Sequence, residues 1–252
     1  MRRRTGRFLT TAQVAAAVGV HPNTVRLYEA WGFLPPIPRG PNGYRRFTEA
    51  HLDLMRLART ALQYPYPGGK EPVLGLLERA KAGDLEGALE LGRGYLDQVR
   101  GERAKAEEAV VILEGWARRG MVSRAGRLLR IGEAASLLET TVDALRHWER
   151  NGLIEVPQDP RNRYRGYGPL ELDRLRVIRV LRSAGYSTMS ILRMLRHLDE
   201  GSTDDLRHVL DTPHPDDDVI YWTDRWLSSL AEQERRAMDV IALLHEMLEK
   251  RG

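Results

Sequence analysis

The stretch TVRLYEAWGFL, residues 24–34, returns 120 residues later as ALRHWERNGLI, residues 144–154. Each copy has an arginine, one variable residue, an aromatic residue and a glutamate, and then, after two more residues, a glycine followed by two apolar residues. The same offset continues beyond the stretch, because Tyr44 matches Tyr164. A repeat that keeps its register over this distance indicates two copies of one domain.

The composition agrees with two small domains in a chain of 252 residues. No apolar run approaches the length of a membrane span, and the N-terminus lacks the apolar segment of a secretion signal, so we expect a cytoplasmic protein. The chain has no cysteine, which excludes disulfides and zinc–thiolate sites. We therefore expect neither a cofactor nor a metal.

The formal net charge of +4 conceals a segregation of charge. Residues 1–60 hold ten arginines and three acidic residues, and residues 124–198 hold fourteen arginines and eight acidic residues. Residues 199–252 instead hold fourteen acidic and six basic residues. Positive charge on the two copies predicts a polyanionic partner.

Start and stop signals in the first copy predict a helix-turn-helix. Thr10 or Thr11 can cap a first helix, which Gly19 ends. Pro22 suits the first position of a second helix, which Gly32 ends. Two short helices joined by a tight turn form this motif.

The segment PPIPRGPNGYRRF, residues 35–47, predicts a two-stranded wing, because Asn42-Gly43 is a strong hairpin signal. Thr48 then caps a third helix, and a shorter helix is expected around residues 73–80. The second copy repeats this order. It has a helix cap at Thr141, a wing turn at residues 157–163, a third helix at 170–182 and a fourth helix from Ser187 to Leu198.

Two long helices are expected at residues 85–119 and 219–250, because apolar residues recur at alternating spacings of four and three. The fold class is therefore mainly α, with tandem winged helix-turn-helix domains, each with a small β-hairpin wing and followed by a long coiled-coil-type helix. The expected parts are a first domain at 8–84, a long helix at 85–119, a linker at 120–127, a second domain at 128–198, and an acidic linker with the last helix at 199–252.

Both copies resemble the DNA-binding domain of the MerR family of bacterial transcription regulators, over roughly residues 8–82 and 128–198. The resemblance rests on the ordered helix-turn-helix, arginine, aromatic residue, glutamate, glycine and the Tyr-Arg that ends the wing. It implies that two such domains, held by an antiparallel pair of long helices, bind across a promoter and distort the DNA for RNA polymerase. Double-stranded DNA and RNA polymerase are thus the expected partners.

The residues expected to contact DNA lie on the second helix and the wing of each copy. Asparagine can read adenine, and arginine can read guanine or hold phosphate. The set is Asn23, Thr24, Arg26, Tyr28, Arg39, Tyr44, Arg45, Arg46, Arg146, Trp148, Arg161, Arg163, Tyr164 and Arg165. The alternative is that these are solvated surface residues, with Tyr28 and Tyr44 in the core. We expect Glu29 to pair with an arginine and fix the helix.

The second copy departs from the first where base reading is expected. Asp143 replaces Asn23, and Trp148, which has no hydroxyl, replaces Tyr28. A carboxylate is repelled by phosphate unless it accepts a hydrogen bond from cytosine. The two half-sites are therefore expected to differ.

Each long helix has one charged residue in its apolar stripe, Arg103 in the first and Glu234 in the second. If these two face each other, helices 85–119 and 219–250 pair antiparallel within one chain as an internal pseudo-dimer. The alternative is a homodimer in which each helix pairs with another chain.

No nucleophile–base pair or paired carboxylates stand out, so we expect no enzyme. Tyr221, Trp222 and Trp226 either line an apolar pocket or pack the last helix on its domain, and packing is favoured. The expected function is a sequence-specific, double-stranded DNA-binding regulator of transcription at promoters. The alternative is a protein-interaction or architectural winged-helix module.

Overall fold

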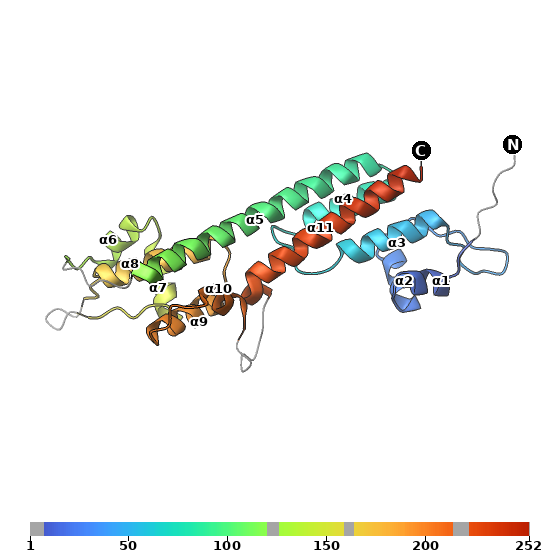
Figure 1. Ribbon diagram of the computed structural model, residues 1–252. Helices are drawn as coiled ribbons and strands as arrows, with labels where there is room; N and C mark the ends of the chain where they lie inside the picture. The colour runs from blue at the N-terminus through green and yellow to red at the C-terminus, as the bar shows by residue number, and fades with distance from the viewer. Residues whose placement is uncertain (1–7, 120–125, 159–163, 214–221, 252) are drawn as a thin grey trace. The chain divides into compact units, whose positions relative to one another are not determined.

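The computed structural model describes residues 8–119, 126–158, 164–213 and 222–251, and these are mainly helical. The chain divides into two units, one of residues 1–100 with 232–252 and one of residues 101–231. Each unit holds one copy of the repeat with parts of two long helices, α5 (Leu85–Arg119) and α11 (Trp226–Glu249) (Figure 1). Among the described helices, none combines the length and apolar character needed to cross a membrane.

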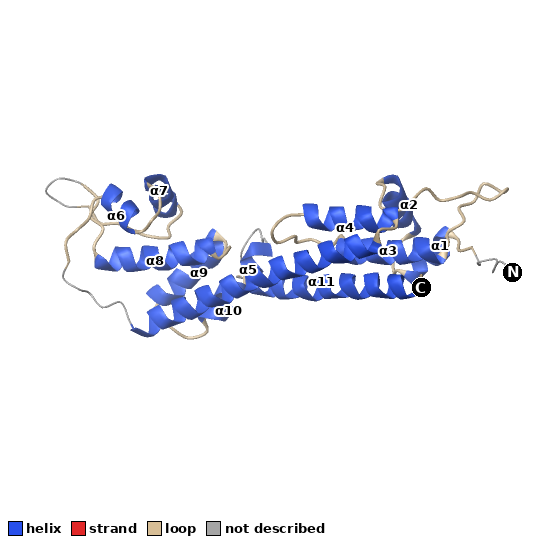
Figure 2. Ribbon diagram, turned by 90° about the horizontal axis from the view of Figure 1, so that it is seen from above, coloured by secondary structure: helices blue, strands red, loops and turns tan. Residues whose placement is uncertain are grey.

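In the first unit, two helices form the helix-turn-helix, and two more lie alongside the start of α5 and the end of α11 (Figure 1, Figure 2). They are α1 (Thr11–Ala17), α2 (Pro22–Ala30), α3 (Glu49–Ala61) and α4 (Glu71–Ala82). Thr10 and Gln13 form a capping box on α1, and Thr48 caps α3. Pro22 opens α2, and Gly83 ends α4 at a left-handed φ of 89°. These boundaries follow the signals in the sequence.

The second unit repeats the arrangement and adds to it. Its elements are α6 (Ile131–Leu137), α7 (Val142–Arg150), α8 (Pro169–Ser183), α9 (Thr188–Asp199), α10 (Leu206–Asp211) and the 3₁₀ helix η1 (Trp222–Arg225). Thr141 and Ser187 cap α7 and α9. Helix α10 lies where the sequence predicts only a polar linker; it forms because Leu206 and Leu210 are buried.

The cores of the two domains correspond position by position. Three buried residues of the first domain each have a buried counterpart 120 residues later: Val25 and Leu145, Phe47 and Tyr167, Met55 and Leu175. The duplication seen in the sequence is therefore also a duplication of packing.

Each described wing is held by isolated antiparallel bridges and contains no extended strand. Arg39 bridges to Arg45 in the first domain, and Gln158 bridges to Arg165 in the second. Prolines, which lack the N–H that a strand ladder needs, occupy four of the seven positions in residues 35–41. Arg45 and Arg165 occupy matching positions of the repeat, but their bridge partners, Arg39 and Gln158, differ from matching positions by one residue.

Within the first unit, α5 and α11 run antiparallel. Arg100 Nε donates to Glu234 Oε1 at 2.8 Å, and at the other end Arg251 Nη1 donates to the Gly83 carbonyl at 2.7 Å. Arg103 and Glu234 belong to different units, so their predicted pairing stays a prediction.

The last helix begins later than expected. Residues 214–221 lie outside the described residues, η1 follows at Trp222, and α11 starts at Trp226. Trp226 is 5% exposed and donates from Nε1 to the Ala184 carbonyl at 2.7 Å. For this residue the prediction of packing on the domain is confirmed, while Tyr221 is not among the described residues.

Candidate nucleic-acid interface

The second helix of each helix-turn-helix presents the same exposed edge. On α2, Asn23 and Arg26 are exposed, and Arg26 Nη1 donates to Asn23 Oδ1 at 2.9 Å. On α7, Arg146 Nη1 lies 3.6 Å from Asp143 Oδ1. The edge of α2 therefore offers an amide and a cation, whereas that of α7 offers a carboxylate and a cation. Thr24, between the first pair, is half-buried.

An ion pair fastens each wing to its second helix. Arg45 Nε donates to Glu29 Oε2 at 2.6 Å, and Arg165 Nε donates to Glu149 Oε1 at the same distance. We call each of these pairs a wing clamp. The predicted structural role of Glu29 is thus confirmed. Both clamps use only Nε, so the Nη groups of the arginine can bind another acceptor.

The aromatic residues at the matching position of the two copies lie inside their domains. Tyr28 is 8% exposed and Trp148 is 7% exposed. Tyr28 packs edge-on against Phe33, with ring centroids 5.7 Å apart. The core alternative therefore describes Tyr28, but not Tyr44, which is 74% exposed on the wing.

The remaining predicted residues are spread over the wings. Arg39 Nη1 donates to the Gly43 carbonyl at 3.1 Å and so stabilises the wing turn. The guanidinium of Arg46 lies 5.1 Å from the ring centroid of Phe8. Tyr164 is exposed, whereas Arg161 and Arg163 lie outside the described residues.

Three exposed residues beside these were not predicted. The guanidinium of Arg130 lies 5.4 Å from the ring centroid of Tyr164. Leu27 of α2 and Trp31, the residue that caps its C-terminus, are 46% and 62% exposed. Their spacing of four residues places them on one face of the helix, but nothing in the sequence alone separates an exposed apolar pair from a buried one.

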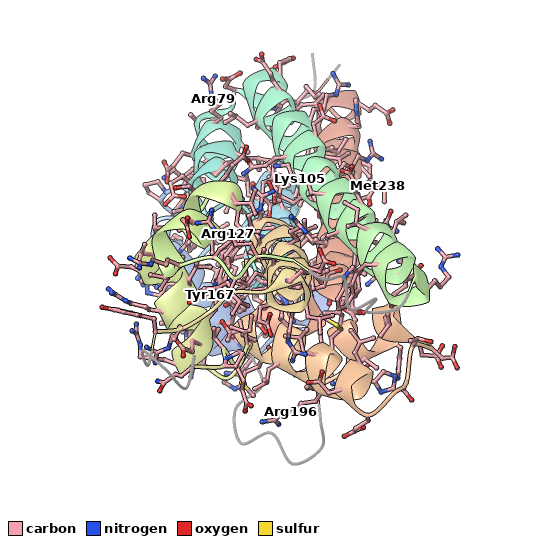
Figure 3. All side chains as sticks on the ribbon, turned by 90° about the vertical axis from the view of Figure 1, so that its left-hand side faces the viewer. Arg79, Lys105, Arg127, Tyr167, Arg196 and Met238 are labelled. Carbon is pink, nitrogen blue, oxygen red and sulfur yellow. The ribbon has the colours of Figure 1, made fainter. Side chains whose placement is uncertain are left out.

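Tyr167 (labelled in Figure 3) is buried in the second domain at the position of Phe47 in the first, and so adds a buried hydroxyl. Burial raises the pKa of the Tyr167 phenol, and the nearby Glu149 carboxylate raises it further. The hydroxyl has no hydrogen-bond partner among the described residues. Within those same residues, no three side chains of metal-binding type are grouped.

Comparison with known proteins matches both domains. Residues 10–47 match the family model described as MerR family regulatory protein, and residues 129–198 match the one described as MerR HTH family regulatory protein. The chain is 36% identical over 67 residues to a probable heavy metal-dependent transcriptional regulator of Haemophilus influenzae, covering 27% of this chain and 52% of that protein. It is 35% identical over 68 residues to the HTH-type transcriptional regulator ZntR of Escherichia coli, covering 27% and 48%.

The matches thus span about half the length of those relatives. A solved structure described as HiNmlR, a MerR family regulator lacking the sensor domain, bound to promoter DNA, is 23% identical, with a TM-score of 0.30, over 55% of this chain and 95% of that one.

Two helix-turn-helix domains in one chain, each with a clamped wing, define a tandem helix-turn-helix protein. Each domain matches a MerR family model, so the chain carries two MerR-type helix-turn-helix domains in tandem.

Proposed function

We propose that this chain binds double-stranded DNA as a regulator of transcription at promoters, and that one chain supplies both half-site readers. The observation that carries the proposal is the duplicated wing clamp. In both domains it holds a basic wing beside a helix edge with an exposed arginine, Arg26 in one and Arg146 in the other. Phosphate contacts from a wing and base contacts from a helix form a common mode of duplex recognition.

Within this proposal, the two domains read different half-sites. Asn23 beside Arg26 suits adenine and guanine edges, whereas Asp143 beside Arg146 suits cytosine and guanine. Tyr28 and Trp148, which are buried, support the helix from behind. The proposed contacts to the DNA phosphates are Arg39, Tyr44, Arg45 and Arg46 of the first domain and Arg161, Arg163, Tyr164 and Arg165 of the second.

The long helices complete the proposal as an internal pseudo-dimer, which a homodimer would replace if each helix paired with another chain. The antiparallel contact of Arg100 with Glu234 within the first unit supports pairing inside one chain. RNA polymerase at the promoter is the proposed protein partner.

The test is selection of bound duplexes from fragmented genomic DNA of the source organism, followed by titration of the best fragment at several salt concentrations. Affinity should fall steeply with salt, and Arg45→Ala and Arg165→Ala should each flatten the slope by about one unit. Arg93→Ala, an exposed arginine of α5, is the control and should leave the slope unchanged. No enrichment at moderate salt would favour a protein-interaction module instead.

A further inference from the structure

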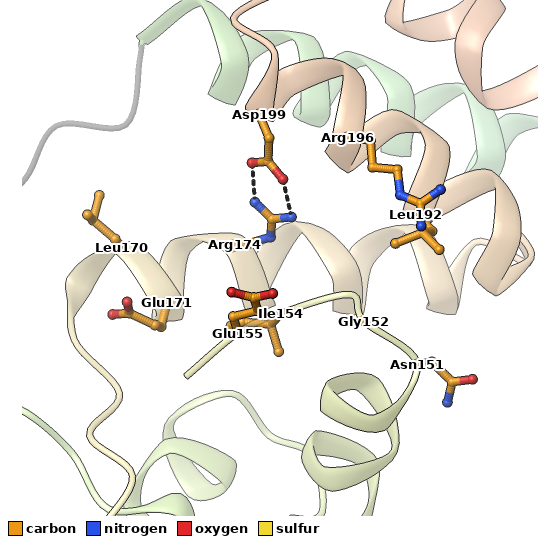
Figure 4. A pocket seen from close by; sticks show the side chains of 10 residues that line it. All are labelled: Asn151, Gly152, Ile154, Glu155, Leu170, Glu171, Arg174, Leu192, Arg196 and Asp199. Atoms are coloured by element: carbon orange, nitrogen blue, oxygen red, sulfur yellow. Dashed lines mark hydrogen bonds and ion pairs between the residues drawn. The ribbon is translucent and has the colours of Figure 1, made fainter. Parts of the chain in front are cut away.

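A groove of about 540 Å³ opens in the second domain, between the loop that follows α7 and the helices α8 and α9 (Figure 4). Its walls are apolar at the partly exposed Leu170 and Leu192, with the buried Ile154 behind them. Grooves of this size accept small molecules and not only water. All its lining residues belong to the second unit.

The floor of the groove is an internally neutralised ion pair. Arg174 donates from Nη1 and Nη2 to the two carboxylate oxygens of Asp199, at 2.6 and 2.8 Å (Figure 4). Its Nε donates to the Leu153 carbonyl at 3.0 Å. Three of the five N–H donors of Arg174 are used in these bonds, which fix its side chain, and the pair with Asp199 carries no net charge for a ligand to match.

Two oppositely charged side chains at the rim of the groove, Arg196 and Glu155, form no such ion pair within the described residues. The Arg196 guanidinium and the Glu155 carboxylate stand apart across the groove (Figure 4), and both side chains are exposed. Neither has a hydrogen-bond or ion-pair partner among the described residues. A cation and an anion separated by apolar walls are complementary to a molecule that carries both charges on an apolar body.

The first domain shows that the fold does not need these charges. At the positions of Glu155 and Arg174, 120 residues earlier, it has Pro35 and Leu54. The glycines that end α4 and α9, Gly83 and Gly201, both have positive φ and align the helices. That alignment places Glu78, of opposite charge, at the position of Arg196.

The corresponding groove of the first domain also differs in what lines it. Met247 of α11 and Lys250, which directly follows α11, form part of its wall, and Lys250 Nζ donates to Asp53 Oδ1 at 2.8 Å. No residue of either long helix lines the groove of the second domain among its described residues. The second groove is therefore open where the first is partly filled.

We propose that this groove binds a zwitterionic small molecule of dipeptide size, with Arg196 holding its carboxylate and Glu155 holding its ammonium group. The apolar side chains of the ligand lie against Leu170 and Leu192. Binding joins the loop that follows α7 to α8 and α9. The inference concerns binding alone and does not depend on the proposed function.

Calorimetric titration of the full chain with dileucine tests the site. N-acetyl-dileucine lacks the ammonium group, dileucine amide lacks the carboxylate, and glycylglycine lacks the apolar side chains. Each analogue should bind at least about tenfold more weakly than dileucine, because each leaves one charged or apolar contact unmade.

Two variants assign the contacts. In Arg196→Gln, dileucine and dileucine amide should bind equally, because the partner of the carboxylate is gone. In Glu155→Gln, dileucine and N-acetyl-dileucine should bind equally. Arg207→Gln, an exposed arginine on α10, should retain the original preferences. Absence of dileucine binding at millimolar concentration, or preferences unchanged in both variants, would overturn the assignment.

Discussion

Glu29 and Glu149 hold the wing arginines through Nε alone. Neither Arg45 nor Arg165 has another hydrogen-bond partner among the described residues. The glutamate therefore fixes the wing to the helix, while the Nη donors of the arginine stay available for another acceptor.

The variant Glu29→Gln tests that separation. It removes the carboxylate charge of the first wing clamp and leaves Arg45 in place, so duplex affinity should fall by about two- to fivefold, as expected for a partly exposed ion pair. The salt slope should stay the same, because no phosphate contact is lost. Fluorescence anisotropy over a salt series measures both quantities. A slope as flat as that of Arg45→Ala would show that the loss of the Glu29 charge withdraws Arg45 from the DNA phosphates.

Tyr95 on α5 carries a buried hydroxyl that has no hydrogen-bond partner among the described residues. A buried, unpaired hydroxyl lowers stability, so Tyr95→Phe should leave the free energy of unfolding unchanged or raise it by up to about 1 kcal/mol at pH 7. Urea unfolding measures this. Tyr44→Phe, at an exposed ring, is the matched control.

The same residue gives a prediction at alkaline pH. Burial raises the pKa of Tyr95 to about 12, whereas an unfolded tyrosine titrates near pH 10. Above pH 10 the unfolded chain loses this proton while the folded chain keeps it, so stability falls as the pH rises from 10 to 12. Tyr95→Phe should lose less stability than the parent between pH 9 and 10.5. An equal loss in both proteins would contradict the assignment.

At the scale of elements, the junction of α8 and α9 depends on a glycine. Gly185 has a φ of +94°, and an added Cβ would lie 2.8 Å from the ring of Trp226. Gly185→Ala should therefore destabilise the protein by about 2–3 kcal/mol, through backbone strain and overpacking. Gly115→Ala in α5 meets nothing within 4 Å and should stabilise by about 0.5–1 kcal/mol. Thermal unfolding compares the two, and equal signs would refute the distinction.

The helix pairing in the first unit has its own test. Glu234 is 15% exposed at its side chain and pairs with Arg100 at 2.8 Å. Glu234→Arg should cost about 1–2 kcal/mol, between the values for exposed and buried pairs. Adding Arg100→Glu should restore most of that stability. Combining Glu234→Arg with Arg103→Glu tests the helix register predicted from the sequence. If this double variant does not regain stability, the predicted pair of Arg103 and Glu234 is wrong.

Local signals account for what the sequence predicted well. Capping residues and glycines, such as Thr10, Thr48 and Gly83, act within a few residues, so they can be read from the chain. Helix α10 was missed because its stability comes from burying Leu206 and Leu210, a tertiary effect within a polar stretch. The sequence left open whether Tyr28 lies in the core and did not predict the burial of Trp148, because the period of a short helix does not say which of its faces another element covers.

At the scale of the whole molecule, the two domains are alike in fold and different at their surfaces. The wing clamp is the same in both domains. The first domain has Asn23 where the second has Asp143, and the groove charges of the second domain have no counterparts in the first. A homodimer of one domain presents identical readers, but a tandem chain lets each reader change separately. Asymmetry is thus the property that distinguishes this chain from a symmetric dimer on DNA.

That asymmetry gives the last prediction. If one chain supplies both readers, the complex with its best duplex should contain one chain per site, as measured by light scattering, and footprinting should protect two half-sites of different sequence. Arg26→Ala should then weaken protection of one half, and Arg146→Ala should weaken protection of the other, each costing about 1–3 kcal/mol in affinity. Two chains per duplex, a palindromic selected site, or loss of both halves with either variant would instead indicate a homodimer in which each chain contributes one active reader.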